Sequence, residues 1–367
     1  MNYDLAEPFL LKPLFKEKIW GGTALEEKLG KDLPDFKVGE SWEISGLDNE
    51  QTSVLKGSLA GTPLGELYSS EPQKLVGDRA YTPDFPLLFK FIDAEDRLSV
   101  QVHPTDEQAV RNNWGSSGKS ECWYIVDAHE DARIIVGFKP GVSQKQIRDA
   151  ILSNSLPEIL NYIPIVSGDV LFIPAGTVHA IMEGTLIYEV QEASDITLRL
   201  YDWDRTDEQG RSRKLHTEEA LSVLDTSTDG NYKIEPVIID EPNGIKHSYR
   251  AACRYFALEQ YAFFRDTQTH LQPKSSFRAV SVIGEAVQLV HRTGSLQVPR
   301  GQSALIPANL EDVWVSGTPG SRFLLTSIPD LKKEIIEPLQ SIGLPREAIA
   351  LLGGFESKND LLKAMQQ

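Results

Sequence analysis

The sequence predicts a mainly β protein built of two jelly rolls and ending in a helical tail. Short runs of alternating apolar and polar residues recur along most of the 367 residues, and Gly/Pro turns separate them. Short strands at such regular spacing are typical of β-sandwiches and jelly rolls. Towards the C-terminus the apolar residues recur at helical spacing instead. We therefore expect a jelly-roll domain at 1–225, a second at 226–329 and a helical tail at 330–367.

Strands are expected first in the N-terminal half, where alternation is clearest. The segment SWEIS is a strand, two strands surround the turn DAED, and two more follow as CWYIVDA and ARIIVGF. The strand pattern returns over residues 163–202. Period two places alternate side chains of each strand on opposite faces, so one face of each can line a core.

Short helices are expected as excursions between these strands. Ser143 and Gln146 form a capping box before apolar residues at helical spacing, and Thr217 is expected to cap a further helix. Further short helices are expected at 62–78, 104–113 and 156–162.

The second half repeats a phrase of the first. Gly168-x5-Pro174-Ala175-Gly176-x2-His179 is echoed by Gly301-x5-Pro307-Ala308-Asn309, and both read as strand, turn, strand. The second copy lacks the histidine. We therefore expect a metal site in the first jelly roll and none in the second.

Composition and charge limit the classes of partner. The net charge of −16 argues against general binding to nucleic acid or anionic membranes. The two cysteines, Cys122 and Cys253, form no CxxC motif, which indicates a reducing compartment. No signal peptide is recognisable and no apolar run approaches ~18 residues, so we expect a cytoplasmic protein with no membrane span.

Candidate metal ligands gather around the segment LSVQVH. Its alternation sends Ser99, Gln101 and His103 to one face of a strand. Glu121 opens a later strand, and His179 ends the phrase PAGTVH. The candidate ligands are therefore Gln101, His103, Glu121 and His179. Two imidazoles and a carboxylate suit zinc, whereas an amide is an unusual zinc ligand, so Gln101 is the least secure of these four. The other histidines, at 129, 216, 247, 270 and 291, are expected at the surface.

Four phrases together resemble a known family. They are FIDAEDRLSVQVHP, GKSECWYI, PAGTVHAI and LRLYDWDR, and their order and spacing over roughly residues 10–325 are similar to those of type I phosphomannose isomerases in the short bacterial form. The phrase ending in His179 resembles the second motif of the cupin superfamily, to which that family belongs. The departures are the helical tail and Ile181, which stands where some relatives place an aromatic residue.

The resemblance implies cupin-type jelly rolls and a zinc-dependent isomerase that interconverts mannose 6-phosphate and fructose 6-phosphate. The implied ligands of one zinc ion per chain are Gln101, His103, Glu121 and His179. The implied catalytic residue is Arg199, and the implied residues of the pocket for the small sugar phosphate are Lys119, Ser99, Glu189 and Asp195. Because an arginine stays charged, Arg199 would stabilise an enediolate or hold the phosphate rather than act as a base. A carboxylate such as Glu189 and a metal-bound hydroxide are the candidates for the base.

Two alternatives stay open from the residues alone. Two histidines and a carboxylate also hold Fe(II) in cupin oxygenases. A non-catalytic sugar-binding cupin would bind the sugar without turnover. Metal analysis, oxygen consumption and an isomerase assay discriminate among the three.

Overall fold

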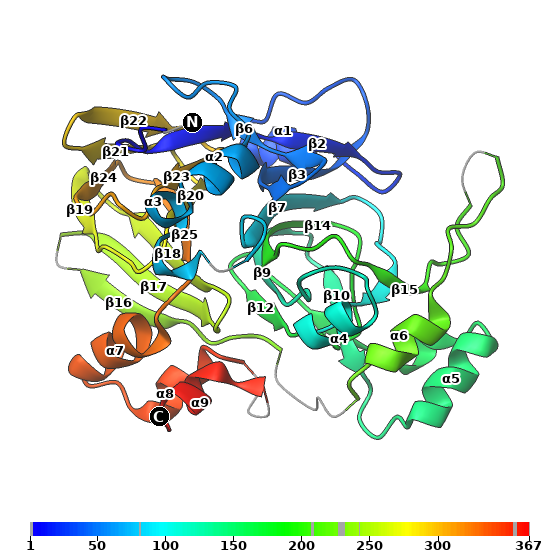
Figure 1. Ribbon diagram of the computed structural model, residues 1–367. Helices are drawn as coiled ribbons and strands as arrows, with labels where there is room; N and C mark the ends of the chain where they lie inside the picture. The colour runs from blue at the N-terminus through cyan, green and yellow to red at the C-terminus, as the bar shows by residue number, and fades with distance from the viewer. Residues whose placement is uncertain are drawn as a thin grey trace.

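The protein consists of two β-rich halves that lie side by side, with helices of the C-terminal tail beneath one of them (Figure 1). The computed structural model describes residues 3–80, 82–206, 209–226, 232–241, 243–354 and 358–366. Strands far outnumber helices in these ranges, so the predicted mainly β fold is confirmed.

Two facing sheets build the N-terminal half. The six-stranded sheet has the order β12 (Val170–Ile173), β9 (Glu121–Ala128), β14 (Thr185–Glu192), β7 (Leu87–Ala94), β3 (Val38–Ile44) and β2 (Leu14–Glu17). The five-stranded sheet has the order β11 (Leu160–Pro164), β10 (Arg133–Phe138), β13 (His179–Ile181), β8 (Val100–Val102) and β15 (Leu198–Tyr201). A short pair, β4 (Gly46–Leu47) and β5 (Glu50–Gln51), lies outside them. One apolar cluster contains Ile125 and Ile187 from the first sheet and Ile134 and Ile181 from the second.

Two further sheets build the C-terminal half. The eight-stranded sheet has the order β16 (Val237–Glu241), β17 (Ile245–Ala252), β18 (Ala257–Phe263), β25 (Arg322–Ser327), β20 (Arg278–Val282), β23 (Ser303–Ile306), β1 (Phe9–Lys12) and β6 (Ser53–Val54). The four-stranded sheet has the order β19 (Thr267–Leu271), β24 (Val313–Gly317), β21 (Val287–His291) and β22 (Gly294–Val298). Their facing sides share a second apolar cluster, which includes Val280 and Phe323 from one sheet and Leu289 and Val315 from the other.

Helices fill the excursions and the tail. They are α1 (Ala24–Leu29), α2 (Leu64–Ser70), α3 (Pro72–Val76), η1 (Gly77–Arg79), α4 (Asp106–Arg111), α5 (Gln144–Leu152), η2 (Leu156–Ile159), α6 (Thr217–Val223), η3 (Leu331–Ile336), α7 (Glu337–Ser341), α8 (Arg346–Leu351) and α9 (Asp360–Ala364). The capping box predicted at Ser143 and Gln146 is present before α5. Among the described residues, no helix is both long and apolar enough to span a membrane.

Two helix predictions are wrong in detail. Over 156–162 only one 3₁₀ turn forms, because the chain continues as β11 and pairs with β10, where Ile134 lies opposite Ile163. Thr217 is the first residue of α6 rather than its N-cap. His216 occupies the N-cap position, and its ring accepts a hydrogen bond from the backbone N–H of Arg199.

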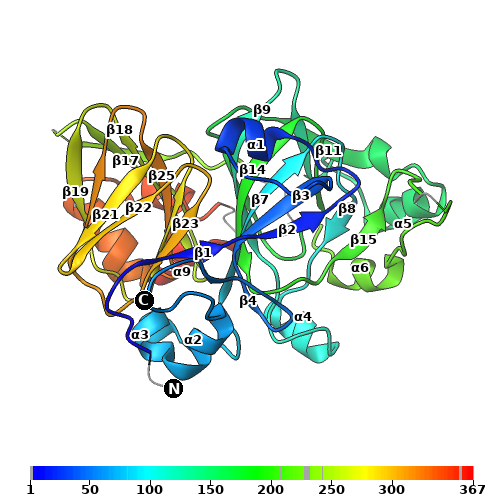
Figure 2. The ribbon, with the colours of Figure 1, turned by 90° about the horizontal axis from the view of Figure 1, so that it is seen from above.

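The two halves share strands and core. The first strand of the chain, β1, pairs with β23 of the C-terminal half, where Phe9 lies opposite Leu305, and Figure 2 shows it crossing between the halves. The largest apolar cluster also joins them, since the rings of Phe89 and Phe277 lie 6.4 Å apart between centroids. The division at residue 225 stays a prediction, because the packing is continuous across it.

A buried ion pair fastens this junction. The Lys31 ammonium lies 2.8 Å from Glu43 Oε1 and also donates to the Gly301 carbonyl of the C-terminal half. The two charged side chains are only 5% and 2% exposed. Removing one partner of such a buried pair strongly lowers the free energy of unfolding, because the other charge is left buried and uncompensated.

Replacing Lys31 by Met is predicted to destabilise the fold by about 3 kcal/mol or more, since Glu43 would keep a buried, unpaired charge. The matched control is Lys28→Met, which removes an ion pair with Asp127 whose lysine is 50% exposed. That change is predicted to stay within about 1 kcal/mol. Urea unfolding of both variants measures the difference, and equal losses would contradict the role given to Lys31.

Candidate metal centre and active site

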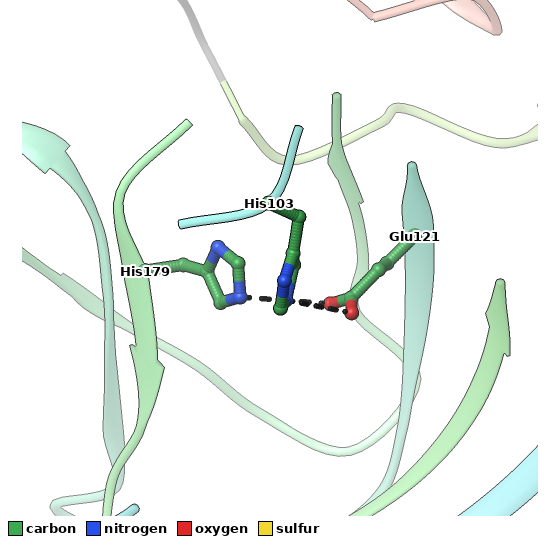
Figure 3. Close-up of side chains that lie close together, drawn as sticks. All are labelled: His103, Glu121 and His179. Atoms are coloured by element: carbon green, nitrogen blue, oxygen red, sulfur yellow. Dashed lines mark ion pairs between the residues drawn. The ribbon is translucent and has the colours of Figure 1, made fainter. Parts of the chain in front are cut away.

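Three side chains from both sheets of the N-terminal half converge in its interior (Figure 3). Glu121 is the first residue of β9, His179 is the first residue of β13, and His103 directly follows β8. Their potential ligand atoms all lie within 4.8 Å of one another. Nε2 of His103 lies 3.2 Å from Glu121 Oε1, and Nε2 of His179 lies 3.7 Å from Glu121 Oε2. All three side chains are 1% exposed, so this cluster is buried.

Strand register places Gln101 beside this cluster. On β8, Gln101 lies directly opposite His179 of β13 on one side and Arg199 of β15 on the other. Directly opposite residues of antiparallel strands point to the same face. The side chains of His179, Gln101 and Arg199 therefore form a row, with His103 two residues after Gln101, just past the end of β8. The structure brings Gln101 to the site, and its role as a ligand stays a prediction.

A tight turn delivers His179. Gly176 has φ +87°, a left-handed conformation that a residue without Cβ adopts at little strain. Its N–H donates to the carbonyl of His103 at 2.8 Å, which ties the two histidine segments together. The glycine in the phrase PAGTVH thus has a local physical function, because the turn it permits lies next to His103 and precedes the buried His179.

The hydrogen bonds of the two imidazoles fix their tautomers. Nδ1 of His103 lies 2.7 Å from the carbonyl of Ile196, and Nδ1 of His179 lies 2.9 Å from the carbonyl of Thr177. A carbonyl only accepts, so each Nδ1 must carry the proton and each Nε2 must present a lone pair.

These lone pairs face another acceptor. Nε2 of His103 and Nε2 of His179 have no hydrogen-bond partner among the described residues, although both are buried, and the nearby Glu121 Oε1 has the Lys119 ammonium at 3.2 Å. Converging acceptors repel one another unless a cation lies between them, and buried polar atoms are rarely left unpaired. The donor set of two imidazole nitrogens and a carboxylate therefore fits a divalent metal such as zinc.

Burial and charge keep these groups in the state that binds a metal. Burial, together with the charge of Lys119, lowers the pKa of His103 to about 3, so the ring is neutral at pH 7. Burial also lowers the pKa of His179. For Glu121 burial alone would raise the pKa, but the nearby Lys119 and His103 hold it well below its usual range.

A polar row on the opposite sheet extends the site. In the register of β7, β14 and β9, Glu189 lies between Lys90 and Trp123. The Trp123 indole N–H lies 2.8 Å from Glu189 and 3.1 Å from Glu121, while the Lys90 ammonium lies 3.4 Å from Glu189. Burial and then the charge of Glu121 raise the pKa of Glu189 to about 7. Glu189 therefore lies close to the cluster, held from both sides.

Lys90 and Trp123 are site residues that the sequence analysis missed. Lys90 is 4% exposed and lies 5.0 Å from the centre of the Trp42 ring and 3.9 Å from Glu40. Burial alone would lower the pKa of Lys90, but Glu189 and Glu40 raise it above the ordinary value. The signal was a lysine inside the otherwise apolar run LLFKFI, where a charge requires a buried partner.

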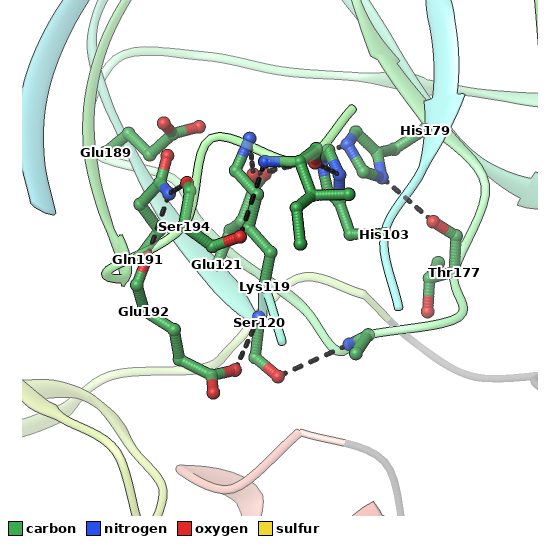
Figure 4. Close-up of polar contacts among 12 residues, drawn as sticks. His103, Lys119, Ser120, Glu121, Thr177, His179, Glu189, Gln191, Glu192 and Ser194 are labelled. Carbon is green, nitrogen blue, oxygen red and sulfur yellow. Dashed lines mark hydrogen bonds and ion pairs between the residues drawn. The ribbon is translucent and has the colours of Figure 1, made fainter. Parts of the chain in front are cut away.

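The other predicted pocket residues lie at different depths. Lys119 is buried, and its ammonium points to Glu121 Oε1 at 3.2 Å (Figure 4). Ser99 is buried just before β8, on the face that Gln101 shares. Asp195 is exposed, although its charge still contributes to raising the pKa of Lys90. The structure therefore gathers Lys119 and Glu189 at the cluster and leaves Asp195 at its rim.

Arg199 carries a charge without a carboxylate partner among the described residues. Its side chain donates to the carbonyl of Lys214 at 3.1 Å, and its Nε is buried without a hydrogen-bond partner there. Nearby, Asp202 is held by Arg205 and Arg213. Burial, and then the charge of Arg213, lowers the pKa of Arg199. This guanidinium is therefore available to an anion that lies on the face of the sheet shared by Arg199 and Gln101.

One expectation about the remaining histidines is wrong. His247 is buried in the C-terminal half, where Nε2 lies 2.7 Å from Glu259 and the ring stacks on Tyr261 at 4.2 Å. The polar letters around it concealed a strand, β17, whose inward face includes His247. A carboxylate partner satisfies this imidazole, unlike those of the metal cluster.

Comparison with known proteins agrees with this geometry. The family model for the catalytic domain of type I phosphomannose isomerases matches residues 9–140. The probable mannose-6-phosphate isomerase GmuF of Bacillus subtilis is 33% identical over 322 residues, which covers 86% of this chain and 98% of the relative. The mannose-6-phosphate isomerase of Streptococcus mutans is 42% identical over 227 residues, covering 62% of this chain and 71% of the relative.

A solved structure gives the same result in three dimensions. The crystal structure of the mannose 6-phosphate isomerase from Bacillus subtilis superposes with a TM-score of 0.80 at 33% identity, covering 88% of this chain and 99% of that one. Sequence identity of this extent over nearly the whole relative, together with the shared fold, identifies the family. The chain belongs to the type I phosphomannose isomerase family.

Proposed function

We propose that this chain is a zinc-dependent isomerase that interconverts mannose 6-phosphate and fructose 6-phosphate through an enediolate. The observation that carries the proposal is the convergence of two imidazole lone pairs and a carboxylate, all buried, in a chain whose relatives are named mannose-6-phosphate isomerases. His103, Glu121 and His179 would hold the ion, with Gln101 as the fourth ligand. The substrate is a small sugar phosphate.

The reaction moves a proton between C1 and C2 of the sugar and another between their oxygens. A divalent cation supplies Lewis-acid polarisation of a substrate oxygen when it is bound. The chain's own cations then have two tasks, because the enediolate and the phosphate are both anionic. Lys119 and Arg199 create a local positive potential in a protein of net charge −16. Arg199 suits this role because its charge is unpaired among the described residues.

Glu189 is the candidate among the side chains for moving the proton. It lies beside the ligand Glu121, since the Trp123 indole reaches both carboxylates, and its second oxygen faces the Lys90 ammonium at 3.4 Å. Lys90 and Trp123 hold its carboxylate in one orientation. Ser99 would line the same pocket and Asp195 its rim.

The two halves would divide the work. The metal and its pocket belong to the unit proposed at 1–225, whereas the unit at 226–329 packs against it and offers no histidine in its copy of the Gly-x5-Pro phrase. We propose that the second jelly roll and the tail at 330–367 support the first rather than bind a second metal.

A coupled assay for fructose 6-phosphate formed from mannose 6-phosphate, with and without a chelator, tests the function. The proposal expects turnover that the chelator abolishes and added zinc restores. Oxygen consumption without isomerisation would favour the oxygenase, and sugar binding without turnover would favour a sensor.

Removal of a ligand should remove the metal. His103→Ala and His179→Ala are each predicted to lose the ion and the activity together, because one imidazole, one carboxylate and the amide of Gln101 would hold a divalent ion weakly. His291→Ala, in the C-terminal half, is the control and should keep both. Elemental analysis of the purified variants gives the metal content, and full occupancy in both site variants would refute the assignment.

Arg199→Ala should separate charge stabilisation from metal binding. We expect it to keep its metal and its fold but to lose activity by about 10²-fold or more, the usual effect of removing one contact made to charge in the transition state. Arg199→Lys should also be impaired, because lysine lacks the planar fork.

Arg148→Ala is the matched control, since that arginine is 51% exposed and pairs with Glu218. Steady-state kinetics with metal analysis measures the effect. Near-normal turnover of Arg199→Ala would exclude Arg199 from the mechanism, and loss of metal would give it a structural role instead.

A further inference from the structure

We infer that the C-terminal tail is a positioning element for the metal centre, acting through Lys358 and Asp360 on the two segments that deliver His179 and Glu121. The inference rests on the proposed function only in taking these residues as ligands. The tail follows the last strand of the C-terminal half, and its helices lie beneath β16 and β17 (Figure 1). Lys358, just before α9, nevertheless reaches the N-terminal half, where it bonds to Ala175 and Asp225.

The first contact reaches the turn before His179. The Lys358 ammonium donates to the carbonyl of Ala175 at 2.9 Å and lies 2.9 Å from the carboxylate of Asp225. Asp225 in turn donates its backbone N–H to the carbonyl of Gly176 at 2.9 Å. Lys358 therefore bonds both to the turn and to Asp225, the residue that holds the turn from the other side. Its side chain is 25% exposed, so water competes only in part for these contacts.

The second contact reaches the segment before Glu121. Asp360 accepts the backbone N–H of Arg254 at 3.1 Å, which holds Arg254 and Tyr255 in place. The Tyr255 hydroxyl donates to Asp106 at 2.8 Å, and the other oxygen of Asp106 accepts the N–H of Gly118 at 2.7 Å.

Ser120 closes the network between the two segments. Its N–H donates to Glu192 at 2.7 Å, and its hydroxyl accepts the N–H of Ala175 at 3.4 Å (Figure 4). The loop before Glu121 and the turn before His179 are thus bonded to each other. The tail is bonded directly to the turn through Lys358, and to the loop indirectly through Tyr255 and Asp106. Loss of either tail contact would loosen the segment that this contact holds, without changing a ligand or a residue of the sugar pocket.

Such supporting contacts usually show in metal affinity, because ligands held in place lose less freedom on binding. We therefore expect Lys358→Met to release zinc roughly tenfold faster than the unchanged protein, with Lys358→Arg restoring most of the difference. Lys333→Met is the matched control, since this tail lysine is 78% exposed and lies 3.9 Å from Asp330.

The test uses the full-length chain in two measurements. Zinc release is timed in excess chelator for Lys358→Met, Lys358→Arg and Lys333→Met. Hydrogen exchange of peptides spanning 118–121 and 174–179 is followed in the metal-free proteins, where it reports the tail contacts whether or not zinc is the native ion. The inference expects faster exchange at 174–179 in Lys358→Met and at 118–121 in Asp360→Asn, with exchange elsewhere unchanged.

Unchanged exchange at 174–179 in Lys358→Met would overturn the inference, and so would a uniform rise across the whole protein, which indicates general destabilisation. Equal zinc release from Lys358→Met and Lys333→Met would also overturn it. If the unchanged protein binds no zinc but exchange still rises locally in Lys358→Met, the tail's positioning role stands and the proposed metal chemistry fails.

Discussion

The structure depends on one electrostatic constraint: three hydrogen-bond acceptors meet in the buried interior of the N-terminal half. The carbonyls of Ile196 and Thr177 take the only proton of each imidazole, so both Nε2 lone pairs face the carboxylate of Glu121. Such an arrangement is unfavourable unless a cation occupies it. The family to which the chain belongs and the chemistry of these donors lead to the same conclusion.

The packing of the two sheets of the N-terminal half brings these three side chains together. Glu121 comes from one sheet and His103 and His179 from the other, so the site exists only when both sheets pack face to face. Around it, Lys119 and Lys90 balance Glu121 and Glu189 in a chain that is acidic as a whole. The junction between the halves and the tail can therefore both affect activity, because each helps to hold these few side chains in position.

Local pattern in the sequence predicted much of this. Period-two alternation in LSVQVH predicted that Gln101 and His103 share a face, and the turn phrase predicted where His179 would lie. Pairing across strands is not a local property, which is why Lys90 and Trp123, brought to Glu189 by register, were missed. His247 was misplaced for a related reason: its polar neighbours hid the buried partner, Glu259, that lies on another strand.

Anomalous diffraction from a crystal, recorded on both sides of the zinc absorption edge, shows whether a zinc ion lies among these three side chains. We expect one strong peak between Nε2 of His103, Nε2 of His179 and the carboxylate of Glu121, present above the edge and weak below it. Ordinary water density at that point, with no anomalous signal in protein purified without chelator and supplied with zinc, would contradict it.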